Sequence, residues 1–445
     1  LLVAAAAAVS AIGAEPAELV FRAGAATSNI TPPLDEPIVG NWGRPLARDV
    51  HDELHVRCLV LDDETAQLAL VIVDNIGMPR EVHDAAKRLI QDKTGIPTNH
   101  VMCACTHTHS STSARGGSKT LPCESFSDYQ KFVIRRMAEA VRRAVNNLEP
   151  ARIGWDRGHE PDQVFNRRYF MKPGTPTPNP FGGTDRVVMN PGRGNPNIDK
   201  AAGPTDPEVP FLAVQSRDGR PVALLANYAL HYVGPGVSDT ISADYFGVFA
   251  DRVQELLEAD RQDPPFVGIL SNGASADINN INWPQRAQQS PAPYEQMTKV
   301  ANEVAQTVHQ AYQAMEFHEW VQLGAEQSEI TLAVRKPTPE QVAYAETVLK
   351  KPEDAKLYHG REKNYAQRVL QLHESPDEVV AVLQALRVGD LGICAIPFEV
   401  FVEIGLELKE TSPLSQTMIL SHANGSYGYL PTVQQHDWGG YETWM

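Results

Sequence analysis

Two histidines separated by one residue follow an apolar run in the segment VMCACTHTHS, residues 101–110. The apolar run predicts a buried strand over 100–106, and residues two apart on a strand face the same side. His107 and His109 are therefore expected to point into one place. A lone histidine at such a position is most often part of the hydrogen-bonded structure, whereas a His-x-His pair points equally well to a metal.

Three further segments carry candidate ligands where an apolar run ends. His231 in NYALHYVGPG lies where a strand breaks into a glycine loop, and Glu399 in ICAIPFEVF lies just past a strand between apolar residues. A carboxylate buried there would need a cation or a metal. Tyr427 and Tyr429 follow the strand MILS in ANGSYGYLPT. Taken singly, each has a structural explanation: a hydrogen-bonded histidine, a solvent-facing glutamate at a helix start, and packing tyrosines.

Two polar segments add candidate catalytic groups. LSNGASADINNIN places Ser275 in a turn with Asp277 and Asn279, where it fits a nucleophile, a substrate-binding hydroxyl or a turn residue. FNRRY holds Arg167 and Arg168, which suit binding of a carboxylate or an oxyanion and equally suit an exposed surface. No single segment decides the chemistry.

Composition and charge narrow the class of protein. The chain has 445 residues, 42% hydrophobic and 21% charged, which is typical of a globular protein. The net charge of −16 argues against a nucleic-acid partner, because phosphate binding needs a basic face. The start, LLVAAAAAVSAIGAEP, predicts part of a secretory signal over residues 1–14 and hence a secreted or periplasmic protein. That run is too short to span a bilayer comfortably.

The cysteine count is odd. An exported protein with five cysteines keeps at least one thiol unpaired within the chain. Cys103 and Cys105 share one face of the expected strand, but Cys-x-Cys lacks the Cys-x-x-Cys spacing typical of zinc sites. The spacing favours two small buried hydrophobic residues over metal ligands.

Apolar runs alternate with amphipathic segments along the chain. Strands are expected at 67–73, 100–106 and 266–270, and in hairpins formed by 211–216 with 221–230 and within 379–396. A helical interpretation of 379–386 competes with the second hairpin. Helices are expected at 81–92, 127–148, 245–258 and 294–315, and from a capping box that begins at Thr338. Residues 155–208, rich in Pro, Gly and Asn, predict a long ordered loop. This mixture predicts an α/β fold: a single large domain with a mixed β-sheet layered by helices, and a metal site at strand ends.

In their order, these segments resemble the neutral/alkaline (non-lysosomal) ceramidase family, in its catalytic N-terminal domain. The resemblance begins near Gly24 and continues to the end of the chain. Its segments are TSNITPPLDEPIVGNWGR, HDELHVRCLVLDD, ACTHTHS, FNRR, NYALHYVG followed by SADYFG, NGASADINN, AIPFEVF and GYLPT…GGYE. The ordered series is specific, although no one motif is.

The resemblance implies a ligand set and roles for the neighbouring residues. One zinc per chain would be held by His107, His231, Glu399 and Tyr429. The catalytic or substrate-contacting groups would be His109, Arg167, Tyr441 and the active-site serine Ser275. The implied enzyme is a hydrolase of linear amide C–N bonds that cleaves N-acylsphingosine to sphingosine and fatty acid by zinc-activated water. A lipid or N-acyl amine substrate further implies peripheral contact with a membrane surface.

The sequence also departs from the family pattern. The typical HTHSGPGG appears as HTHSSTSARGG, with the glycines delayed to Gly116 and Gly117, and the serine motif SPN appears as Ser275-Ala276-Asp277. The family's C-terminal β-sandwich is missing, so residues 15–445 are expected to be a catalytic domain cut short at its C-terminus.

These departures keep alternatives open. One is a zinc amidase acting on a smaller N-acyl substrate, and another is an acyl-enzyme route through Ser275 as nucleophile. A two-metal phosphoesterase would use the His-x-His pair with Asp74 and Asn75. A non-catalytic secreted binding protein is the last, and the presence of candidate ligands at all four positions argues against it.

Overall fold

The structure is a computed structural model and describes residues 19–40, 43–114, 125–286 and 290–444. The predicted signal at 1–14, Gly116, Gly117 and Cys123 lie outside the described residues. Among the helices within those ranges, none is long and apolar enough to cross a membrane.

The centre of the molecule is a mixed sheet of eight strands. In spatial order these are β16 (Val267–Asn272), β14 (Pro221–Tyr228), β13 (Glu208–Ser216), β8 (Glu149–His159), β1 (Arg22–Asn29), β4 (His55–Asp62), β5 (Gln67–Val73) and β6 (Val101–Cys105). The pairs β14–β16 and β5–β6 are parallel, and the other neighbours are antiparallel. The expected fold class, a single α/β domain with a mixed sheet, is therefore confirmed.

A second sheet covers one face of the first. It consists of β18 (Leu323–Ala333), β19 (Glu378–Val388), β20 (Leu391–Ala395) and β22 (Gln416–Leu420). Alternate residues of β4 point to opposite layers: Leu59 and Leu61 join the apolar cluster between the sheets, whereas Cys58 and Val60 join the cluster under the helices. Both faces of these strands are buried, which explains why runs such as LALVIV, residues 68–73, carry no polar residues.

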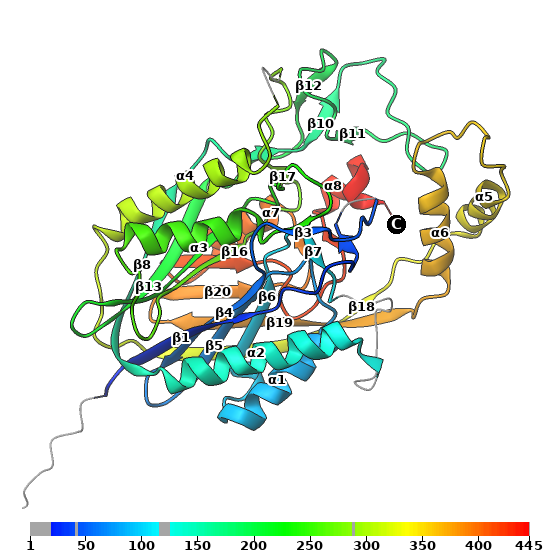
Figure 1. Cartoon of the computed structure of the whole chain (residues 1–445). Coiled ribbons are helices and arrows are strands. Elements are labelled where there is room, and N and C mark those ends of the chain that lie inside the picture. The colour runs from blue at the N-terminus through cyan, green and yellow to red at the C-terminus, as the bar shows by residue number, and fades with distance from the viewer. Residues whose placement is uncertain (1–18, 41–42, 115–124, 287–289, 445) are drawn as a thin grey trace, which may run out of the picture.

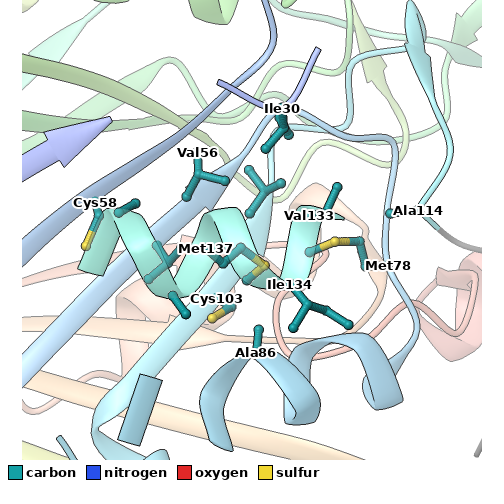
Figure 2. Packing of buried hydrophobic residues seen from close by; sticks show 14 of the residues in the cluster. Ile30, Val56, Cys58, Met78, Ala86, Cys103, Ala114, Val133, Ile134 and Met137 are labelled. Carbon is teal, nitrogen blue, oxygen red and sulfur yellow. The ribbon is translucent and has the colours of Figure 1, made fainter. Parts of the chain in front are cut away.

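Helices cover the other face of the large sheet (Figure 1). The helices are α1 (Arg80–Thr94) with α2 (Asp128–Asn146) over one half, and α3 (Asp244–Leu256) with α4 (Glu295–Tyr312) over the other. Figure 2 shows Val133 and Met137 of α2 among the buried residues of the first cluster, which also includes Cys58 and Cys103. Cys103 and Cys105 are both fully buried there, so the prediction of small hydrophobic residues is confirmed. Burial raises the pKa of Cys103 to about 11.

The expected long loop at 155–208 is wrong in part. The range contains the end of β8 and four short strands: β9 (Phe165–Asn166), β10 (Arg168–Met171), β11 (Val187–Met189) and β12 (Ile198–Ala201). The last three form a small sheet of their own, while β9 pairs with the distant β17 (Ile278–Asn279). The polar composition of the range hid these strands, and the partner of β9 lies more than a hundred residues away in the sequence.

The second hairpin is confirmed as β19 and β20, and the helical alternative is wrong because β19 pairs with β18 along its whole length. Two helices, α5 (Pro339–Leu349) and α6 (Glu362–His373), form an insertion between β18 and β19. They pack on each other over a small apolar cluster of their own and stand to one side of the sheets (Figure 1). The capping box at Thr338 with Gln341 is present.

Candidate metal centre and its surroundings

The candidate ligands lie just past the ends of strands that belong to both sheets. His107 follows β6, His231 follows β14, and His422 follows β22. Glu399 opens the short strand β21 (Glu399–Val400) just after β20. Each ligand lies two to four residues past its strand, so the position of the strand ends sets the position of the ligands.

One asparagine links these loops through its side-chain amide and its backbone oxygen. The Nδ2 of Asn272, the last residue of β16, donates to the carbonyl oxygens of Thr106 (3.2 Å) and Leu230 (3.3 Å). Its Oδ1 accepts from the hydroxyl of Ser275 (2.7 Å), and its backbone oxygen accepts from the amide of Ser421 (3.1 Å). Asn272 thus links the loops that carry His107, His231 and His422. The sequence segment contained this residue, but nothing in its type or spacing singled it out.

Three histidine nitrogens meet at one point. Nε2 of His107 lies 3.0 Å from Nε2 of His109 and 3.1 Å from Nε2 of His231. Neutral imidazoles that face each other can share only one proton per pair, so three of them in one place are poorly satisfied by hydrogen bonds alone. Nitrogens bound to one zinc at roughly 2.1 Å lie about 3.4 Å apart in a tetrahedral site, close to the separations seen.

Glu399 completes the case for a cation. Its Oε2 is buried without a hydrogen-bond partner and lies 3.7 Å from Nε2 of His107 and 4.0 Å from Nε2 of His231. A buried carboxylate oxygen in this state is costly unless a cation neutralises it. The ligand atoms of His107, Glu399 and His422 all lie within 4.8 Å of one another, as do those of the three-histidine group. The structure therefore holds a His/Glu group that fits a metal ion.

Hydrogen bonds fix the orientation of the two principal histidines. Nδ1 of His107 lies 2.5 Å from the carbonyl oxygen of Ile76, and Nδ1 of His231 lies 3.1 Å from that of Ser275. A proton on Nδ1 in each ring leaves Nε2 with its lone pair directed at the metal position. Burial, followed by the charge of Arg167, lowers the pKa of His231 well below its usual value, which keeps this ring neutral and able to ligate.

His109 is held by packing. Its ring stacks on Tyr232 with centroids 3.7 Å apart, and Gly40 lies close to its Cα, Cβ and Cγ atoms. Burial and His107 lower the pKa of His109. His109 and Tyr232 also line a cavity of about 250 Å³ with the glycine loop at Gly234–Ser238. The residue therefore lies between the metal position and open space.

Tyr429 and Arg167 lie beside Glu399. Strand β23 (Tyr429–Leu430) pairs in parallel with β21 so that Tyr429 is the partner of Glu399. Arg167 donates from Nη2 to the hydroxyl of Tyr429 (3.3 Å) and from Nε to Glu442 (2.8 Å). Burial and Glu399 raise the pKa of Tyr429, and Arg167 opposes them. Burial disfavours the charge of Arg167, but Tyr429 and Glu442 raise its pKa overall.

Neither arginine of FNRRY lies on the surface. Arg167 is 5% exposed and Arg168 is 0% exposed, so the surface interpretation is wrong. Glu442 accepts from both, with Arg168 Nη1 at 2.6 Å. Tyr441, next to Glu442, has its ring 5.9 Å from that of Tyr429, and burial and Glu399 raise its pKa. The predicted Arg167 and Tyr441 are thus brought to the side of the candidate centre where Glu399 lies.

Ser275 is buried and supports the site through its backbone. Its hydroxyl donates to Asn272, and its carbonyl oxygen faces His231. The side chain is 1% exposed. This geometry gives Ser275 a direct part in orienting His231.

His422 is the residue that the sequence analysis missed. Its ring stacks on that of His107, with centroids 3.9 Å apart and an angle of 15° between the planes. The ligand atom of His422 lies within 4.8 Å of those of His107 and Glu399, but a metal lies near the plane of an imidazole that binds it, and the planes of two stacked rings do not meet at a nearby point. His422 is therefore better placed to support the ring of His107 than to share its metal. The rule that found the other candidates, a histidine just past an apolar strand, would have found this one in ILSHANG.

The backbone at these two histidines is strained. His107 has φ +67° and His422 has φ +54°, a region that side chains other than glycine seldom occupy. Such strain concentrates where the surrounding structure over-determines a functional position.

The Asp74 carboxylate of the two-metal alternative is engaged elsewhere through Oδ2, while its Oδ1 is buried without a hydrogen-bond partner. Asp74 accepts from Arg57 Nη1 (2.5 Å) and from the amide of His55 (2.9 Å), and Asn75 donates to the carbonyl of Thr112. Both side chains are fully buried. Their contacts give them a structural role.

The fold is that of known ceramidases. The crystal structure of neutral ceramidase from Pseudomonas aeruginosa matches with a TM-score of 0.68 and 16% identity, covering 96% of this chain and 71% of that one. A structure described as ceramidase complexed with C2 matches with a TM-score of 0.66 and 16% identity, covering 96% of this chain and 72% of that one. No protein-family model and no curated protein matches the sequence. At this identity the likeness is one of fold, and it confirms the fold that the resemblance implied.

Proposed function

We propose that the protein is a zinc-dependent amide hydrolase that acts on an N-acyl amine, with N-acylsphingosine as the leading substrate. The observation that carries the proposal is the convergence of the imidazole nitrogens of His107 and His231 on the buried, unpartnered oxygen of Glu399. The ceramidase fold supports the choice of an amide as substrate. A smaller N-acyl amine is the alternative substrate.

The proposed ligands are His107, His231, Glu399 and Tyr429, for one zinc per chain. When bound, zinc would supply Lewis acidity toward the amide carbonyl and lower the pKa of a water molecule to about 7. Two imidazoles, one carboxylate and one phenol would together hold the metal.

The surrounding side chains have distinct proposed tasks. His109, neutral and adjacent to the cavity, accepts the proton that leaves the attacking water and returns it to the departing nitrogen. Arg167 and Tyr441 donate hydrogen bonds to the oxygen on which negative charge develops. One water is consumed: its oxygen joins the acyl carbon, the C–N bond breaks, and the nitrogen leaves as an amine. The Glu442 ion pair holds Arg167 in position for this task.

We further propose residues 15–445 as the catalytic domain of a secreted or periplasmic protein, preceded by the signal at 1–14. An N-acylsphingosine substrate would bring the protein into peripheral contact with a membrane surface. The acidic net charge supports the absence of a nucleic-acid partner.

The experiment that tests the proposal measures zinc content and N-acylsphingosine hydrolysis on the same samples. We expect one zinc per chain in the wild type, and loss of both zinc and activity in His107→Ala. His373→Ala, which changes an exposed histidine on α6, is the matched control and should behave as wild type. One zinc per chain without lipid hydrolysis would reject N-acylsphingosine and favour a smaller substrate. A wild type that binds no zinc would reject the metal centre itself.

Ser275→Ala separates the two nucleophiles. If water attacks, the variant keeps most of its turnover, because the carbonyl oxygen that faces His231 is unchanged. If the serine hydroxyl forms an acyl-enzyme, turnover falls by several orders of magnitude and no acyl intermediate is trapped on acid quenching.

A further inference from the structure

A cavity of about 250 Å³ adjoins the candidate metal centre at His109. Its other walls are Ser110, Tyr232 and the loop 234–238. Of the described residues that line this cavity, none has an ionised side chain, because burial lowers the pKa of His109 well below its usual value and the rest are neutral. The cavity therefore fits an uncharged group.

Hydrogen bonds hold the walls of this cavity in place. The buried carboxylate of Asp244, the first residue of α3, accepts from the amides of Val233 (3.2 Å) and Gly234 (2.8 Å). The carbonyl oxygen of Ser110, in another wall, accepts from the amide of Ser242 (2.9 Å). Both walls are thus tied to the start of α3, so the cavity is a fixed part of the folded structure.

Tyr232 contributes a phenol to the cavity wall. Its ring stacks on that of His109, with centroids 3.7 Å apart and an angle of 12° between the planes. Among the described residues, its hydroxyl has no hydrogen-bond partner. Burial raises the pKa of Tyr232 and Arg167 opposes this effect, so the phenol keeps its proton at neutral pH. A protonated phenol can both donate and accept a hydrogen bond, and it would pair with a hydroxyl group of a ligand in the cavity.

The proposed reaction decides which half of the substrate enters the cavity. His109 returns a proton to the departing nitrogen, so this nitrogen has to face His109 and the cavity beside it. Arg167 and Tyr441 donate to the carbonyl oxygen from the side of the centre where Glu399 lies. The amine half of the amide therefore extends into the cavity.

We infer that this cavity binds the amine half of the substrate, that the amine is a small amino alcohol, and that Tyr232 binds its hydroxyl group. The inference rests on the amide hydrolysis of the proposed function and chooses the smaller of its two substrate classes. A cavity of about 150 Å³ holds one benzene molecule, so a cavity of about 250 Å³ holds roughly ten non-hydrogen atoms. Ethanolamine fits within this number, whereas the long chain of sphingosine does not. Tyr232 is thus a specificity residue that contacts the leaving group.

The test compares the hexanoyl amides of ethanolamine, propylamine and sphingosine. The first two have the same number of non-hydrogen atoms, and only the first carries a hydroxyl group. For the full chain with bound zinc, chromatography of the released amine gives kcat/KM, and titration calorimetry gives the affinity for the same amides in the same detergent. The variants are Tyr232→Phe, which keeps the stacked ring, and Tyr358→Phe, a control on an exposed tyrosine of the insertion between β18 and β19.

We expect the wild type and Tyr358→Phe to cleave the ethanolamide with a kcat/KM roughly tenfold above that of the propylamide, and above that of the sphingosine amide. In Tyr232→Phe the ratio of ethanolamide to propylamide kcat/KM should fall to about one, because the hydroxyl group has lost its partner. Equal kcat/KM for these two amides in the wild type would overturn the inference. A ratio that Tyr232→Phe leaves unchanged, or faster cleavage of the sphingosine amide, would also overturn it.

The two proposals fail separately. Tighter binding of the ethanolamide that depends on Tyr232, without cleavage of any amide, would uphold the cavity assignment and count against the proposed reaction. Cleavage of the amides without a preference for the ethanolamide would do the reverse. An equal loss for both small amides in Tyr232→Phe would overturn the inference and leave the phenol a role in supporting His109. If neither small amide binds or is cleaved, the inference fails, and cleavage of the sphingosine amide in the same samples decides the proposed function.

Discussion

Gly40 gives a sharp test of how His109 is positioned. Its φ is +114°, and a Cβ built there would lie 2.6 Å from Cγ, 2.7 Å from Cβ and 2.8 Å from Cα of His109. Ordinary contact begins at 3.4 Å, so the histidine and its backbone would have to withdraw by roughly 0.6–0.8 Å in the variant Gly40→Ala. Glycine is required at this position both for its backbone conformation and for the approach of the ring.

The expected cost of Gly40→Ala has two parts. Backbone strain should lower the free energy of unfolding by about 1–3 kcal/mol. Displacement of a catalytic group by most of an ångström should lower kcat by roughly tenfold to a hundredfold. His107 and His231 do not contact Gly40 in this way, so zinc stoichiometry should stay at one per chain if His109 is a catalytic group. If His109 is itself a ligand, zinc affinity should fall with kcat.

The assay combines denaturant unfolding, zinc competition with a chelator, and turnover of the N-acyl substrate that the wild type cleaves best. Gly43→Ala is the control, because a Cβ there meets nothing within 4 Å. Wild-type kcat in Gly40→Ala would refute the positioning argument. Equal damage in both variants would show that the whole loop, and not the contact with His109, is sensitive.

Three other predictions concern the surroundings of the site. Glu442→Gln leaves two buried guanidinium groups without their carboxylate and should lower the free energy of unfolding by about 3–5 kcal/mol, measured by urea denaturation at pH 7. The control Glu64→Gln, at an exposed ion pair, should change it by less than about 1 kcal/mol. Burial raises the pKa of Asp244 to about 6, so the folded wild type holds the carboxyl proton more tightly than the unfolded chain does. The free energy of unfolding should therefore fall by up to roughly 3 kcal/mol as pH rises from 4 to 6. Asp244→Asn should not show this fall in calorimetric melts, and an equal fall in both proteins would contradict the assignment. His422→Phe keeps the stacked ring without its nitrogens, so its zinc affinity, measured by chelator competition, should stay within about threefold of the wild-type affinity. A drop in zinc affinity of about a hundredfold would make His422 a ligand.

Local sequence patterns identified many of the helices and the buried strands. The apolar face of α2 and the capping box at Thr338 depend only on residues a few positions apart, so the sequence predicts them without tertiary structure. Strands such as β5 can be predicted from the sequence because both of their faces are buried, which gives an uninterrupted apolar run. The short strand β9 was missed because its partner β17 lies more than a hundred residues away.

The sequence by itself determined which residue types stand at the strand ends: the His-x-His pair, His231, Glu399 and Tyr429. It did not determine their convergence, because that depends on how two sheets pack and on where Asn272 ties the loops together. Only the tertiary structure showed that His422 stacks on His107 and that Arg168 is buried in an ion pair. The physical reason is that a residue's type and its local period are properties of the chain, whereas burial, pairing and metal geometry depend on contacts between segments far apart in sequence.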